Sequence, residues 1–223
     1  MPLLLRRRQS AFTLVELLVV MVVIVALLAI VAPVVTSMKG AGDVSKTVYD
    51  VAGILEQSRT YAMGNNTYVY VGLAEVDVTK PASGKQTAGT GRLGIAVVAT
   101  KDGTQGSVLN WTTNYASLTN NLTVVGKPVT FDNIHVPDLG APPAAGSMTR
   151  PALAAVGYSL GNDGCQSATP FDYPVGASID AGNFSFKKVI QFDPQGVARI
   201  QSAGNPSGIT PYLEIGLQQT RRN

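Results

Sequence analysis

An apolar segment near the N-terminus constrains this chain more than any other feature. The run from Leu17 to Val35 holds nineteen residues, and only Pro33 interrupts its hydrocarbon and small side chains. About twenty apolar residues span the hydrocarbon core of a bilayer. The run therefore predicts a membrane-spanning helix, and the arginines at 6–8 favour a cytoplasmic N-terminus.

One acidic residue, Glu16, lies at the start of this apolar segment, with leucine or valine on both sides. A carboxylate within lipid costs about 3 kcal/mol and requires a partner, because lipid has no polar groups to offer. The position of Glu16 therefore predicts a functional role.

Two simpler kinds of N-terminal segment explain part of this pattern. A secretory signal peptide has an apolar stretch of only about 7–15 residues that ends at a small-residue cleavage site. Here the stretch is longer and continues past Ala32 into Pro33. A plain membrane anchor explains the length and the arginines. Neither explains the sequence Phe-Thr-Leu-x-Glu at residues 12–16, directly after a basic leader.

The junction at residues 6–18, RRRQSAFTLVELL, resembles the class III signal of type IV pilins and of the pseudopilins of type II secretion. In that family a prepilin peptidase cuts on the cytoplasmic side before a Phe and methylates the new N-terminus. An acid five residues into the mature chain then guides assembly. The resemblance implies cleavage between Ala11 and Phe12, methylation of Phe12 and an assembly role for Glu16. The family usually has Gly before the cut; Ala11 is also small, and we expect processing to proceed.

Removal of the leader changes the charge of the chain. The full sequence has 17 Lys and Arg against 14 Asp and Glu, a net charge of +3. Residues 1–11 contain three arginines and no acid, which leaves 14 of each sign in the mature chain. The positive charge is therefore poor evidence for nucleic-acid binding.

The remainder of the chain is long enough to fold without a disulfide. Residues 65–223 form one domain of 159 residues, a size that buries roughly two-thirds of its unfolded surface. The single cysteine, Cys165, excludes an intramolecular disulfide. We expect it to be a buried or loop thiol.

The pattern predicts one long helix with a break. The apolar part runs from Thr13 to about Val35, and Pro33 and the glycines at 40 and 42 are helix breakers. After Asp43, the expected N-cap, the pattern becomes amphipathic and ends near residues 64–66, whose Gly-Asn-Asn sequence is a stop signal. The face expected to pack on a head consists of Val44, Val48, Val51, Ala52, Leu55 and Ala62.

The rest of the sequence is typical of short β-strands separated by turns. In the first strand Val69, Val71 and Leu73 share one face, and the Asp-Pro-Gln-Gly sequence at 193–196 predicts a turn. Polar loops are expected at 79–92 and 137–151. The predicted strands are 67–73, 94–100, 122–125, 129–131, 156–160, 184–192, 197–201 and 213–217. In the strand at 184–192 one face carries Phe184, Phe186, Ile190 and Phe192; in the last, Leu213, Ile215 and Leu217 do so.

These features together predict an α+β fold. A long N-terminal helix, transmembrane in its first half and amphipathic in its second, packs on a β-rich globular head of antiparallel strands. The expected divisions are a cleaved prepilin leader at 1–11, the transmembrane helix half at 12–37, the amphipathic helix half at 38–64 and a pilin-like head at 65–223.

Two later stretches are similar to the H-type minor pseudopilins. Residues 54–66, ILEQSRTYAMGNN, contain a Ser-Arg pair, an Ala a few residues on and then an Asn, followed by a predicted strand. The turn at 192–196, FDPQG, is similar to a turn in the same subfamily. The resemblance leaves the type of subunit open between this class and other minor pilins.

Apparent catalytic signals fail on their context. Residues 89–94, GTGRLG, fit the letters of a dinucleotide fingerprint, which must follow a strand and open a helix. Here the segment follows a polar loop and leads into a β-branched run, so a loop entering a strand is the better interpretation. For the single histidine, His135, the sequence shows no recognisable partners for a triad or a metal site. We expect it to be structural or exposed.

A calcium site is a further alternative. Asn162, Asp163, Asp172 and Asp180 could supply oxygen ligands, and some major pseudopilins bind calcium in their heads. The spacing matches no EF-hand loop, and Asp, Asn and Gly are also ordinary turn residues. We therefore expect no metal and no cofactor.

Three classes of function remain. The first is a structural minor pilin or pseudopilin that is processed by prepilin peptidase, enters the inner membrane in a single pass and joins other pilin subunits in a fibre, with its head in the periplasm or outside the cell. The second is a DNA-binding minor pilin of a DNA-uptake system, favoured only by Arg221 and Arg222. The third, a membrane-anchored enzyme, lacks a cluster of catalytic residues. The first is expected.

Overall fold

The structure is a computed structural model of the whole chain, and it describes residues 13–104, 121–137, 160, 170–176, 183–199 and 214–220. Within the helix, the side chains of residues 30–42 lie outside this description. The chain divides into two compact units, 1–43 and 44–223, which are described separately.

Helix α1 runs from Leu14 to Asn65 and has 52 residues. The expected break is wrong, because the helical backbone continues through Pro33 and through the glycines at 40 and 42. The expected N-cap at Asp43 is wrong for the same reason, since Asp43 lies inside the helix. A proline removes one backbone donor and an interior glycine costs about 1 kcal/mol. Such local penalties lower the stability of a long helix without ending it.

The C-terminal end of α1 confirms the predicted stop signal. Asn66 has a φ of 49°, the left-handed conformation that Asn adopts more readily than most residues. The amide of Thr67 donates to the carbonyl of Ala62 at 3.1 Å, which is the hydrogen bond of a Schellman cap. The hydroxyl of Thr67 donates to the carbonyl of Thr100 at 2.6 Å and fastens the helix end to the sheet.

The second unit contains an antiparallel sheet, as predicted. Its strands follow the order β3-β2-β1-β8-β9, and β4 also pairs with β2. The smaller pairs are β5 with β10 and β6 with β7. The bounds are β1 Val69–Asp77, β2 Gly91–Thr100, β3 Leu122–Val124, β4 Val129–Asp132, β5 Ile134–His135, β6 Phe171–Tyr173, β7 Phe184–Phe186, β8 Lys188–Phe192, β9 Ala198–Arg199 and β10 Gln218–Gln219.

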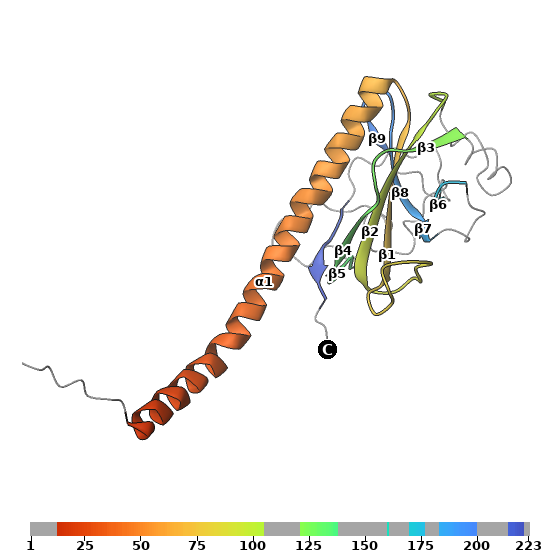
Figure 1. Cartoon of the computed structure of the whole chain (residues 1–223). Helices are drawn as coiled ribbons and strands as arrows, with labels where there is room; N and C mark the ends of the chain where they lie inside the picture. The colour runs from red at the N-terminus through yellow and green to blue at the C-terminus, as the bar shows by residue number, and fades with distance from the viewer. Residues whose placement is uncertain are drawn as a thin grey trace, which may run out of the picture. The chain divides into compact units, whose positions relative to one another are not determined.

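The central strands are buried on both faces, so the second unit has layers. Val69, Val71 and Leu73 lie together in one core cluster, as the alternation predicted, and the C-terminal part of α1 packs on this cluster. Tyr70 points to the opposite face and joins a second cluster with the phenylalanines of β6 and β7. Figure 1 shows α1, the central strands and the β6–β7 pair as successive layers in residues 44–223.

The packed face of α1 differs from the expected one. Val51 and Ala62 are buried as predicted, but Val48 is 46% exposed and Ala52 is also exposed. Thr47 and Ser58 are buried in their place. Burial of Ser58 is tolerated because its hydroxyl donates to the carbonyl of Ile54 at 2.7 Å. The prediction assigned only apolar residues to the buried face of α1. The observed buried face is therefore rotated about the helix axis relative to the predicted one.

The single strand predicted at 184–192 is wrong. It is two strands, β7 and β8, which belong to different sheets and are separated at Lys187. The separation changes which side chains share a surface. Phe184 and Phe186 join the second core cluster, whereas Ile190 and Phe192 join the first.

The phenylalanines rest on two glycines of the central strands. A Cβ at Gly72 would lie 2.6 Å from atoms of Phe171 and Phe186, and a Cβ at Gly94 would lie 2.8 Å from Phe184. Real Cβ atoms do not approach so closely. These glycines form a notch that the aromatic rings fill, with the rings of Phe184 and Phe186 stacked 5.7 Å apart.

The other strand predictions have mixed outcomes. The turn at 193–196 is confirmed, with the Gly196 amide donating to the Asp193 carbonyl at 2.8 Å, and β9 pairs with β8 beyond it. The last strand is wrong, because β10 is Gln218–Gln219 and Ile215 lies outside it. Of the strand predicted at 156–160 only Leu160 is described; it is buried and not in a strand. The loop predicted at 137–151 lies almost wholly outside the description, and β2 begins inside the other predicted loop.

Candidate functional site

The acid singled out by the sequence caps its own helix. Glu16 lies three residues after Thr13, and its carboxylate accepts hydrogen bonds from the Thr13 amide at 3.0 Å and the Thr13 hydroxyl at 2.9 Å. The Glu16 amide in turn donates to the Thr13 hydroxyl oxygen at 3.3 Å. This reciprocal pair is a capping box, which satisfies donors that the first turn of a helix leaves free. The carboxylate therefore has a partner within its own chain.

The sequence analysis missed the capping role of Thr13. The signal was present, because Thr-x-x-Glu directly before an apolar run is the sequence form of a capping box. The prediction for Glu16 rested instead on its position in an apolar segment and on the resemblance to pilins. Arg6, Arg7, Arg8, Ala11 and Phe12 lie outside the described residues.

The first turns of α1 carry apolar side chains on every side. All large hydrophobic residues from Leu14 to Leu28 are exposed, from 81% at Leu14 to 46% at Ile24. A helix that is apolar all round requires an apolar environment. Within the part of the chain that the structure describes, no helix reaches the length and apolar character needed to cross a membrane.

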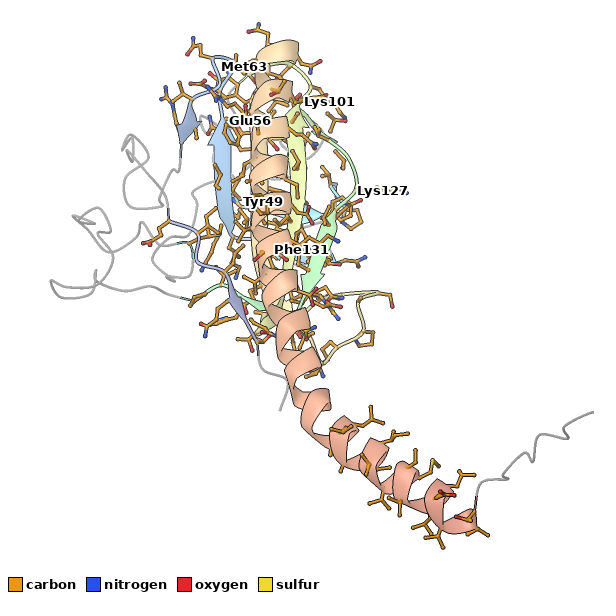
Figure 2. All side chains as sticks on the ribbon, turned by 90° about the vertical axis from the view of Figure 1, so that its left-hand side faces the viewer. Tyr49, Glu56, Met63, Lys101, Lys127 and Phe131 are labelled. Carbon is orange, nitrogen blue, oxygen red and sulfur yellow. The ribbon has the colours of Figure 1, made fainter. Side chains whose placement is uncertain are left out.

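The two stretches that resemble H-type minor pseudopilins are in contact in the second unit. The side chain of Arg59 donates from Nε to the carbonyl of Gly196 at 3.1 Å. Gly196 has a φ of 79°, and a Cβ there would lie 2.7 Å from the sulfur of Met63. Figure 2 places Met63 near the C-terminal end of α1. The helix end and the Asp-Pro-Gln-Gly turn thus form one joined structural element.

The dinucleotide-like segment is a loop that enters a strand, as its context indicated. Gly91 begins β2, and no helix follows it. Arg92 is buried and pairs with Asp132 of β4. Its guanidinium also donates to the Lys80 carbonyl at 3.0 Å and to the Gln86 side chain at 3.3 Å. Arg92 therefore holds the 80–86 loop against β4 and is not disposed to bind a phosphate.

His135 has a structural partner. Its Nδ1 lies 2.8 Å from Oε1 of Glu75, whose other carboxylate oxygen accepts the Val136 amide at 3.1 Å. Glu75 also accepts the Gly91 amide at 3.0 Å. A single carboxylate thus links β1, the start of β2 and β5. This geometry bears out the expectation that His135 is structural.

Two carboxylates of the second unit have lowered pKa values. The side-chain hydroxyl and then the amide of Thr79 hydrogen-bond Asp77 and lower its pKa. The amide of Thr104 lowers the pKa of Asp102, with a further contribution from the Asn121 side chain. Both aspartates form Asx turns, Asp77 at the end of β1 and Asp102 two residues after β2, and the ionised carboxylate is the better acceptor.

The described residues do not support the calcium site that the sequence left as an alternative. Of its four candidate ligands, Asp172 lies in β6 and is buried, while Asn162, Asp163 and Asp180 fall outside the description. No group of three potential metal-ligating side chains occurs in the ranges that the structure describes. Cys165, Arg221 and Arg222 also lie outside these ranges.

Comparison with known families identifies the N-terminal segment. Residues 6–32 match the prokaryotic N-terminal methylation motif, the signal of type IV pilins and pseudopilins. This motif is the signal that prepilin peptidase processes in pilin-type proteins, and the match covers 27 of the 223 residues. Comparisons with curated proteins and with solved structures give no match.

Proposed function

We propose that this protein is a structural minor pseudopilin or minor pilin of a type II secretion pseudopilus or a type IV pilus-like fibre. The observation that carries the proposal is the methylation motif at residues 6–32, with Thr13 and Glu16 paired at the first turn of α1. In this proposal the peptidase cuts between Ala11 and Phe12 and methylates Phe12. Glu16 then guides the entry of the subunit into the fibre.

The capping box gives Glu16 two states in this mechanism. In the free subunit its carboxylate is held by Thr13, which lowers the cost of placing a charge beside lipid. Assembly offers a second partner, the positively charged amine of Phe12 on a neighbouring subunit, which adds the attraction between opposite charges to the hydrogen bond. The exchange of Thr13 for that amine favours a neighbour in the correct axial register.

Within this class we propose an H-type minor subunit. The Ser58-Arg59 pair, Ala62 and the turn at 192–196 carry the resemblance, and Arg59 links the two stretches directly. The mature head would lie in the periplasm or in the fibre, with the helix N-terminus on the cytoplasmic side of the inner membrane before cleavage.

Processing provides the direct test. Co-expressed with a prepilin peptidase, the chain should lose eleven residues, and intact mass should identify N-methylated Phe12 at the new N-terminus. Ala11→Gly should be cut at least as fast, and Ala11→Leu should remain uncut because the peptidase must accommodate the residue before the bond. An uncut wild-type chain, or a cut near residue 30, would contradict the proposal.

A second measurement separates a fibre subunit from a DNA-binding minor pilin. The mature chain has balanced charge, so we expect only weak binding of duplex DNA. Sub-micromolar binding that falls steeply with salt and is lost in the double variant Arg221→Ala/Arg222→Ala would instead assign the chain to DNA uptake.

A further inference from the structure

The second unit contains a cavity of about 380 Å³ between α1 and the edge of the sheet. Its walls are Ile54 on the helix, Ile95 and Val97 on β2, and Val125 and Val129 beside β2. Ligand pockets are typically about 300–1,000 Å³, and an apolar cavity of about 150 Å³ holds one benzene ring. The space is therefore suited to one alkyl chain of roughly ten carbons.

The cavity arises from the backbone rather than from a poor fit of side chains. Val124 pairs with Val98 and Val129 pairs with Ile95. Between these pairs β2 has two residues, whereas the neighbouring chain has four, 125–128. The two extra residues bulge from the sheet edge at Gly126, whose φ is 80°. Such bulges commonly occur beside binding sites.

Polar groups also line the cavity. Among the described residues that line it, Gln57, Tyr61 and Lys127 have polar groups to offer, Lys127 carries a charge and none is acidic. Ser58 also lines it, but its hydroxyl is already bonded to the Ile54 carbonyl. Among the described residues the side chains of Gln57, Tyr61 and Lys127 have no hydrogen-bond or ion-pair partner. In Figure 2 Lys127 lies to the side of α1 and extends outward.

We propose that this cavity binds a medium-chain alkyl carboxylate. Its apolar walls take the chain, and the ammonium of Lys127 pairs with the carboxylate at the mouth, where Gln57 and Tyr61 can donate hydrogen bonds to the same oxygens. An apolar interior with a single cation at the rim is complementary to an anionic amphiphile and disfavours a cationic one. The flexible stem of Lys127 allows the ammonium to close over the bound chain.

Equilibrium dialysis of radiolabelled decanoate tests the proposal. The full chain is held in zwitterionic phosphatidylcholine nanodiscs, and empty discs supply the baseline for partition into lipid. We expect saturable binding of one decanoate per chain, competition by unlabelled decanoate and little competition by decyltrimethylammonium. Lys127→Glu should weaken binding at least about tenfold, because one charge-assisted contact is lost and the new carboxylate repels that of decanoate.

Matched variants separate the cavity from the rest of the chain. Lys101→Glu removes a lysine that does not line the cavity and should change binding less than about twofold. Ile54→Trp and Val129→Trp, which fill the cavity from opposite walls, should both abolish it. Val129 is 39% exposed, so its variant should melt near the wild-type temperature and remains informative if Ile54→Trp unfolds.

Three results would overturn the proposal. They are the absence of saturable binding, equal competition by the decyl cation, and undiminished binding in a folded Val129→Trp variant. The last would place the alkyl chain outside the cavity.

Discussion

The two ends of α1 obey different rules although they share one backbone element. Between Leu14 and Leu28 large apolar side chains face outward on all sides, and the only charged residue is Glu16, capped by Thr13. Between residues 44 and 65 one face is buried on the sheet and the other carries polar and charged groups. The first pattern suits an apolar solvent and the second suits the surface of a folded domain.

Both ends are helical, so the difference between them lies in which side chains are buried. Burial therefore indicates what each end of the helix contacts. The N-terminal turns have side chains available to lipid or to neighbouring helices. In the C-terminal turns the apolar face is buried against the sheet. Asn66 caps their end, and Arg59 hydrogen-bonds to the Gly196 carbonyl. Changes at one end should therefore affect assembly, and changes at the other should affect the stability of the second unit.

The largest expected effect is on assembly. Glu16→Ala should be cleaved and inserted normally but enter fibres at least tenfold less well, a difference of about 1.4 kcal/mol or more, because the proposed charge pair with Phe12 of a neighbouring subunit would be lost. Glu16→Asp, one methylene shorter, should retain part of the activity. Cysteine crosslinking to neighbouring subunits measures the incorporation. Equal incorporation of Glu16→Ala would show that the acid does not guide assembly.

The next effect is on the stability of the second unit. Val51 is 5% exposed and Val48 is 46% exposed, although they lie only three residues apart on the same helix. Val51→Ala should lower the free energy of unfolding by about 2 kcal/mol, whereas Val48→Ala should change it by less than about 0.5 kcal/mol. Both substitutions change helix propensity equally, so the difference isolates burial. Urea unfolding of the full chain measures both, and equal losses would place the packed face where the sequence first suggested.

A smaller effect is expected at the capping box. Thr13→Ala should cost about 1 kcal/mol at the start of α1 and raise the amide exchange rates of the first turn about fivefold. Thr13→Ser keeps the hydroxyl and serves as the control. Neither variant should alter the unfolding of the second unit. Unchanged exchange in Thr13→Ala would mean that Glu16 is not held by its own chain.

The smallest effect concerns pH. The pKa of Asp77 is lowered in the folded state by Thr79, so its contribution to stability is present above its ordinary unfolded value of about 3.9 and is lost as pH falls through the folded value. Asp77→Asn should therefore unfold slightly more easily than wild type at pH 7 and equally at pH 2. Urea midpoints at the two pH values provide the measurement. A difference that persists at pH 2 would assign the effect to something other than the charge.

Sequence reasoning reached the elements with strong local signals. The N-terminal motif, the stop at Asn66, the turn at 193–196 and the alternation in β1 are each determined by residues close in the chain. Asn66 adopts a left-handed conformation, and Gly196 does so at the turn. Such backbone preferences belong to single residues and are visible in the sequence.

Sequence reasoning failed where the structure is determined by contacts between residues far apart in the chain. In 184–192 the phenylalanines of β7 lie against Gly72 and Gly94, whereas β8 pairs with β1, and no local pattern reveals these distant contacts. Burial of Ser58 depends on a hydrogen bond within the helix and on the sheet that covers it. Thr13 was overlooked for a different reason: its capping signal is local, but the prediction for Glu16 considered only the lipid environment and the assembly role implied by the resemblance.

The glycine notch has a consequence for how such a chain can evolve. Gly72 and Gly94 admit no larger residue while Phe171, Phe184 and Phe186 lie against them. Replacement of either glycine by a larger residue requires that the phenylalanine packed on it first change to a smaller residue. Loss of a phenylalanine ring in turn leaves a void, which favours a larger residue at the glycine position. These positions, more than a hundred residues apart for Gly72 and Phe186, should therefore be inherited as a coupled set, and an isolated exchange at one of them should be purged until its counterpart changes.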